Sequence, residues 1–133
     1  MYLTYTIKQA LSLRALLPDA VIALPMFDRE SLAAAQQAGL VDERLLAMVR
    51  PRAVDERFIP ELEALGATVL SASYGGAQSP DALYRTAQDA AVYHELANQG
   101  PRLIVANRPF EAAASMLALP GYAEKLARCG IRG

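Results

Sequence analysis

The chain has 133 residues, of which 53% are hydrophobic, and its formal net charge is −1. This length fits one domain or part of one. The net charge gives no excess of positive charge to attract phosphate backbones, so we expect no nucleic-acid partner. No charged segment leads into a long apolar stretch near residue 1, so we expect neither a signal peptide nor a membrane span. Cys129 is the only cysteine, which excludes an intramolecular disulfide and is compatible with a cytoplasmic location.

Short apolar runs alternate with alanine-rich helical patterns along the chain, which is typical of a parallel α/β fold. The expected strands cover residues 1–7, 21–24, 45–49, 68–71 and 103–106. The expected helices cover residues 8–17, 29–38, 81–98 and 110–117. A further helix, capped by Asp55 and ending at residue 65, lies between the second and third of these, and one more short helix is expected in the tail.

Three residues on or beside the expected helices have specific predicted roles. Asp28 directly precedes the helix over 29–38, so we interpret it as an N-cap rather than a metal ligand. Gly39 follows that helix as a candidate C-cap. His94 is the only histidine and lies inside the helix expected over 81–98, where we expect it on a solvated face.

The number of repeats is too small for a closed barrel. Eight βα units typically need about 250 residues. We therefore predict a half or incomplete TIM barrel over residues 1–119, followed by a helical tail over 120–133. Such an open parallel sheet exposes apolar side chains and unpaired edges, which predicts a homo-oligomer, most simply a two-fold dimer.

In such folds, the binding and catalytic residues lie at the carboxyl ends of the strands and in the loops that follow them. Arg50 and Arg52 follow the strand over 45–49, and two guanidinium groups there could hold a phosphate by bidentate hydrogen bonds. The alternative is a surface ion pair of these arginines with Asp55 or Glu56.

The next two strand ends supply further candidates for an anion site. Ser71 and Tyr74 belong to the glycine-containing segment 71–76, whose backbone N–H groups could approach an anion; a plain turn is the alternative. Asn107 and Arg108 follow the last strand and would point to the same rim, unless Asn107 only forms an Asx turn.

The candidate strand ends contain little that could drive hydrolysis. A phosphodiester hydrolase needs a general acid and base and often a metal held by acidic side chains. The strand ends supply one carboxylate, Asp28, and no histidine. We therefore assign no catalytic residue, no metal ligand and no cofactor from the residues themselves.

The order of segments resembles the carboxyl-terminal half of the bacterial glycerophosphodiester phosphodiesterases. The similar segments are residues 27–40, 63–69 and 90–109. The resemblance implies a TIM barrel, a role in lipid metabolism, a phosphoester ligand and a divalent metal, Mg²⁺ or Ca²⁺. It also implies that Ser71, Tyr74, Asn107 and Arg50 face the substrate.

The chain departs from this family in two respects. Where the family has Thr-Asp before the Arg-Pro of its last strand, this chain has Ala106 and Asn107, so a carboxylate is lost. The family's catalytic histidines, its opening His-Arg-Gly and its acidic metal ligands belong to a front half that this sequence does not contain. No catalytic residue is therefore carried over.

Three functions remain open at this point. The first is a self-associating half-barrel without phosphodiesterase activity as an isolated chain. The second is a phosphoric diester hydrolase whose site is assembled between chains. The third is a module that binds phosphate or another small molecule.

Overall fold

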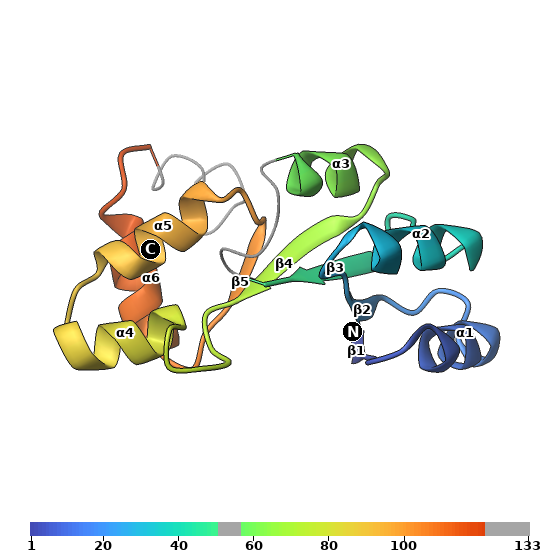
Figure 1. Ribbon diagram of the computed structural model, residues 1–133, viewed down its shortest axis with the longest axis horizontal. Helices are drawn as coiled ribbons and strands as arrows, with labels where there is room; N and C mark the ends of the chain where they lie inside the picture. Colours follow the sequence, from blue (N-terminus) through green and yellow to red (C-terminus); the bar gives the residue numbers. More distant parts are fainter. Residues whose placement is uncertain (51–56, 122–133) are drawn as a thin grey trace.

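The computed structural model describes residues 1–50 and 57–121, and within them the chain folds as a curled, half-barrel α/β structure (Figure 1). Its parallel strands pair in the order β1-β2-β3-β4-β5. The strands are β1 (Tyr2–Leu3), β2 (Ile22–Pro25), β3 (Leu45–Val49), β4 (Thr68–Ala72) and β5 (Leu103–Val105). The helices are α1 (Ile7–Leu16), α2 (Arg29–Gln37), α3 (Phe58–Ala64), α4 (Pro80–Ala87), α5 (Ala91–Asn98) and α6 (Pro109–Leu117). The predicted fold class is confirmed.

The expected first strand is much shorter than residues 1–7. Thr4 turns back to β2 through both its backbone N–H and its hydroxyl, which donate to the Ala23 carbonyl at 2.9 and 3.0 Å. Thr6 then caps α1 by accepting a hydrogen bond from the Gln9 N–H at 3.2 Å. Strand pairing therefore ends at Leu3 because the following threonines serve a turn and a helix cap.

Asp28 is the N-cap of α2, as predicted. Its carboxylate accepts from the Ser31 N–H at 2.7 Å, and its own N–H donates to the Ser31 hydroxyl at 3.1 Å. Hydrogen bonds from Ser31 hold the pKa of Asp28 below its ordinary value. Gly39 follows α2 with φ +65°, a left-handed conformation that suits glycine.

The single helix predicted over 81–98 is wrong, because the chain breaks between α4 and α5. Gln88 adopts φ +55° and donates its N–H to the Tyr84 carbonyl at 2.7 Å, which ends α4. The Asp89 carboxylate then accepts from the Ala91 N–H at 2.9 Å, at the start of α5. The two helices pack through the rings of Tyr84 and Tyr93, whose centroids are 5.4 Å apart.

His94 does not lie on a solvated face, which corrects the sequence-based expectation. Its Nε2 is 2.7 Å from the Ser115 carbonyl oxygen on α6, and the side chain is half-buried. The difference arises because α6 covers this side of α5. The contact links the two helices, so a structural role accounts for this histidine.

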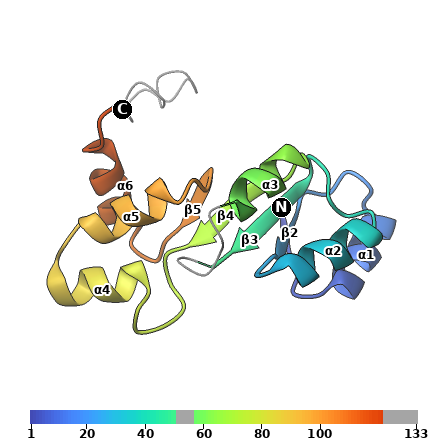
Figure 2. The ribbon, with the colours of Figure 1, turned by 45° about the horizontal axis from the view of Figure 1, so that its top comes forward.

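Helices cover buried apolar residues in two regions of the molecule, and Ala23, Leu46 and Leu70 form a small separate cluster on the concave face. The larger helix-covered group fills the space between β2–β4 and helices α1–α3; its members include Ile22, Leu24, Leu45, Phe58, Leu62 and Val69. The smaller group lies among α4–α6; its buried members are Tyr93, Leu96, Ala112 and Met116. Figures 1 and 2 show α4–α6 gathered at the end of the molecule that carries β5, away from α1 and α2.

None of the helices in residues 1–50 and 57–121 has the length and hydrophobicity of a membrane-spanning segment.

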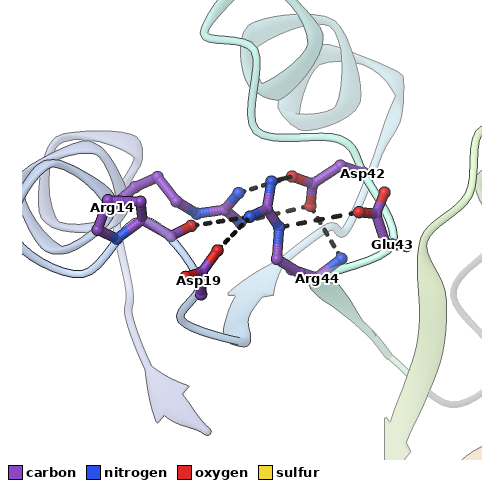
Figure 3. Close-up of polar contacts among 6 residues, drawn as sticks. Arg14, Asp19, Asp42, Glu43 and Arg44 are labelled. Atoms are coloured by element: carbon purple, nitrogen blue, oxygen red, sulfur yellow. Dashed lines mark hydrogen bonds and ion pairs between the residues drawn. The ribbon is translucent and has the colours of Figure 1, made fainter.

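A charge network joins α1 to the segments that precede β2 and β3 (Figure 3). The Arg14 guanidinium donates to both oxygens of Asp42, at 2.6 and 3.4 Å. Arg44 also donates to Asp42 at 3.1 Å and reaches Asp19 at 3.2 Å. Burial by itself would raise the pKa of Asp42, but the hydrogen bonds from Arg14 and Arg44 hold that pKa below its ordinary value.

We expect Asp42→Asn to lower the free energy of unfolding at pH 7 by about 1–3 kcal/mol, because the hydrogen bonds from Arg14 and Arg44 lose the carboxylate charge and one acceptor oxygen. Since the pKa of Asp42 is lowered by folding, its contribution is complete above the unfolded pKa of about 3.9 and is lost as pH falls through the folded pKa. Urea unfolding of both proteins at pH 7 and pH 3 measures this. Asp19→Asn is the control, and an Asp42→Asn effect of equal size at both pH values would contradict the assignment.

A candidate binding site at the carboxyl ends of the strands

The concave face of the sheet is built from alternate residues of each strand. One row contains Ala23 and Leu46, and the next contains Met48, Leu70 and Leu103 in register. A third row, nearer the carboxyl ends, pairs Ala72 with Val105. These rows give the half-barrel an apolar floor, part of which is open to solvent: Leu3 is 51%, Leu103 43% and Val105 37% exposed.

A cavity of ≈ 680 Å³ lies over this floor and opens at the carboxyl ends of the strands. Its walls are mainly apolar and aromatic. They include Leu3, Tyr5, Ala23, Phe27, Met48, Leu70, Ala72, Tyr74 and Val105, together with Arg50 and the loop residues Gly75, Gly76, Gln78 and Ser79. Among the described residues that line the cavity, Arg50 carries the only charged side chain. We call this space the half-barrel cavity.

The position of Arg50 follows from strand register. Pro25 pairs with Met48, so the residues two positions further on, Phe27 and Arg50, are neighbours in the next row of the concave face. The Arg50 guanidinium carbon lies 4.1 Å from the centroid of the Phe27 ring. Stacking on a ring face fixes the guanidinium plane while its in-plane N–H donors remain suited to a bidentate anion.

A second, more polar hollow of ≈ 690 Å³ lies between the loop before α4 and the turn before α6. Tyr74 borders both hollows. The second one is also lined by Arg85, Asn107, Arg108 and Glu111. Arg108 donates to Glu111 at 3.1 Å, so its charge is partly neutralised, whereas Arg85 is exposed.

The five predicted rim residues are therefore distributed over two hollows and the helix-facing side of the sheet. Arg50 and Tyr74 line the half-barrel cavity, and Tyr74, Asn107 and Arg108 line the second hollow. Ser71 lines neither: it is buried, shares a strand face with Val69, and its hydroxyl donates to the Val49 carbonyl at 3.5 Å. Arg52, Asp55, Glu56, Cys129 and the predicted helix in the tail lie outside the described residues.

The sequence-based list omitted a buried carboxylate beneath this rim, Asp81 on α4. Its Oδ1 accepts from the Ser73 hydroxyl at 2.7 Å and from the Tyr93 hydroxyl at 2.9 Å. Its Oδ2 accepts from the Asn107 N–H at 2.8 Å. Asp81 is only 8% exposed. Its hydrogen bonds connect the end of β4, helix α5 and the turn after β5.

The sequence contains a signal that could have identified Asp81. Pro80 and Asp81 open a helix directly after the loop that follows β4, so a carboxylate in this first turn lies close to the strand ends. Burial of the Tyr93 hydroxyl, and to a smaller extent its hydrogen bond to Asp81, raises the pKa of Tyr93 well above its ordinary value. The phenol therefore keeps its proton and donates a hydrogen bond to the Asp81 carboxylate.

The described residues at the mouth do not fit the divalent metal that the sequence resemblance implies. Mg²⁺ and Ca²⁺ prefer several carboxylate or carbonyl oxygens arranged around one point. The mouth offers rings, a guanidinium and an amide, and the Asp81 oxygens already accept hydrogen bonds. In residues 1–50 and 57–121 no group of three or more His, Cys, Asp or Glu side chains could hold a metal. We therefore assign no step to a metal.

Comparison with known proteins identifies the fold. No protein-family model matches the chain, and no curated protein sequence matches it. Among solved structures, a glycerophosphoryl diester phosphodiesterase from Parabacteroides distasonis ATCC 8503 is similar, with a TM-score of 0.76 and 20% sequence identity. The similarity covers 89% of this chain and 41% of that one, so this chain spans less than half of the similar structure. The predicted resemblance is thus confirmed for the fold: the chain folds as part of a glycerophosphodiester phosphodiesterase-like TIM barrel.

Proposed function

We propose that this half-barrel binds a phosphoester or another small anion at its mouth and does not hydrolyse it as an isolated chain. The half-barrel cavity carries the proposal, because Arg50 is the only charged side chain among its described lining residues. A guanidinium in a largely apolar cleft favours an anion. The Asp28 carboxylate interacts electrostatically with Arg50, but it does not line the cavity. The fold similarity to a glycerophosphoryl diester phosphodiesterase supports a phosphoester as the first candidate.

The lack of hydrolysis is proposed from the chemistry of the mouth. General acid–base catalysis needs a side chain that gives or takes a proton at the reacting atom. Asp28, the carboxylate at the strand ends, already caps α2 by accepting from the Ser31 N–H. Three donors occupy the two oxygens of Asp81. A hydrolase whose site is assembled between chains is the alternative, and it would need groups from outside the described residues.

We expect Arg50→Gln to weaken the binding of glycerol 3-phosphate by at least about tenfold, because a charge-assisted, bidentate contact is lost. Isothermal titration calorimetry of both proteins measures the effect. Arg102→Gln is the matched control, because Arg102 is an exposed arginine that lines neither hollow. Equal affinity of the wild-type protein and Arg50→Gln would contradict the proposal.

The same preparations test catalysis. Bis(p-nitrophenyl) phosphate with Mg²⁺ or Ca²⁺ is the probe, and release of nitrophenol is followed. No turnover is expected. Turnover that copurifies with the chain through successive columns would instead support the inter-chain hydrolase.

We also propose that the chain self-associates, most simply as a two-fold dimer. Among the described strands, β1 and β5 are the edges of the sheet, and each has a strand neighbour on one side only. Tyr2 on β1 and Leu103 on β5 are 47% and 43% exposed, and neither lines the half-barrel cavity. A second copy at the edges would remove apolar surface from water and would leave the mouth accessible.

A reducing cytoplasm is the proposed location, on the basis of the single cysteine.

A further inference from the structure

We propose that the half-barrel cavity selects an anionic amphiphile, with the anionic group on Arg50 and an alkyl or aromatic body on the concave floor. This inference rests on the proposed anion binding and adds the chemical class of the remainder of the ligand. It follows from the contrast between the single charge at the mouth and the apolar rows beneath it.

The floor offers no partner for a polar ligand body. Its described side chains are Ala23, Met48, Leu70, Ala72 and Val105, none of which can donate or accept a conventional hydrogen bond. Ala23 and Leu70 are buried, so the accessible part of the floor is formed by Met48, Ala72 and Val105. A polyol lying on this surface would lose hydrogen bonds to water without replacement, whereas an alkyl chain would leave water favourably.

The mouth places the charge at the border of this floor. Phe27 supports the Arg50 guanidinium at 4.1 Å, and Tyr5 and Tyr74 supply further aromatic surface to the same cavity. With Arg50 as the one charged side chain and no carboxylate among the described lining residues, the cavity favours an anionic head over a cationic or zwitterionic one. Its volume of ≈ 680 Å³ lies within the range of ordinary small-ligand sites.

The charge argument distinguishes this occupant from a second copy of the chain. A second copy at the sheet edges would lie along β1 and β5, but nothing in that contact requires a guanidinium fixed at the carboxyl ends of the strands. An amphiphile uses both features, because its body covers the floor and its head meets Arg50. We therefore assign the cavity to the amphiphile and the sheet edges to the second copy.

The test compares methyl, butyl and octyl phosphate by calorimetry, with each probe below its micelle concentration. Affinity is expected to rise about threefold per added methylene until the floor is covered. Arg50→Gln should weaken all three probes by a similar factor. Octanoate, tested alongside octyl phosphate, shows whether the head must be a phosphate or only an anion.

A matched pair of valine variants tests the floor. Val105→Thr keeps the side-chain shape but adds a hydroxyl to the floor, and it should weaken octyl phosphate about threefold to tenfold without changing methyl phosphate. Val21→Thr is the control, because Val21 and Val105 are both 37% exposed and Val21 does not line the cavity. Equal effects of the two variants would overturn the inference.

The remaining outcomes separate this inference from the proposed function. Equal affinity for methyl and octyl phosphate would overturn the amphiphile but leave anion binding intact. Binding of methyl phosphate but not octyl phosphate would show that the floor is already covered by another part of the protein or a second copy, and would also overturn it. Failure of all three probes would remove the proposed anion binding itself.

Discussion

Asp81→Ala is expected to lower the free energy of unfolding by about 3–5 kcal/mol, a large share of the stability of an ordinary domain. The Tyr93 hydroxyl and the Asn107 N–H would lose their acceptor, and the Ser73 hydroxyl would keep only its longer contact to the Val105 carbonyl at 3.2 Å. Leaving buried donors unsatisfied costs about 1–3 kcal/mol each, and water entering the space would recover part of that cost.

Urea unfolding followed by circular dichroism measures this change. Asp81→Asn should show an intermediate loss, because its amide keeps one acceptor oxygen but also introduces donors beside the existing ones. Asp19→Ala is the control: the Asp19 side chain is 99% exposed, and its ion pair with Arg44 is worth at most about 1 kcal/mol. An Asp81→Ala effect as small as that of Asp19→Ala would show that the network contributes little.

Leu103→Lys is expected to convert the proposed dimer into a monomer, with the dissociation constant raised by about 100-fold or more. Leu103 is 43% exposed on the edge strand β5, and its side chain lies on the concave face beside Leu70. A dimer contact there would have to bury a lysine charge, and edge lysines oppose strand pairing between chains.

Light scattering coupled to size-exclusion chromatography, over a range of protein concentrations, measures the mass. Leu16→Lys is the matched control, because Leu16 is an exposed leucine on α1 that does not line the half-barrel cavity. Both variants should keep the wild-type circular dichroism spectrum. A wild-type protein that remains a monomer at tens of micromolar would refute self-association.

The middle of the sheet could be predicted from the sequence for a physical reason. Strands β2, β3 and β4 are covered on at least one face, so they are continuous apolar runs with short connections. Residues 45–49 were predicted with the bounds that β3 has in the structure. The cap at Asp28 was equally local, because the capping contacts lie within four residues.

The arrangement of the candidate site residues at the strand ends could not be predicted from local sequence, because it depends on which strands are neighbours and which face each residue occupies. Ser71 and Tyr74 were grouped as one loop, but β4 continues to Ala72, and strand alternation places Ser71 on the helix-facing side. The Asp81 network joins residues up to 34 positions apart when its nearest and farthest members, Ser73 and Asn107, are compared. Such a network becomes visible only once β4 and β5 are known to be neighbours.

The separation of the apolar residues into two groups has a consequence for how this chain opens. Helices α4–α6 pack mainly on one another, and they are tied to the sheet through β5 and the Asp81 hydrogen bonds. The larger group, around β2–β4 and α1–α3, has no member from these helices. Local stability follows such packing units. We therefore expect two cooperative units, with the rim formed by Asn107 and Arg108 opening at a lower free-energy cost than the unfolding of the whole sheet.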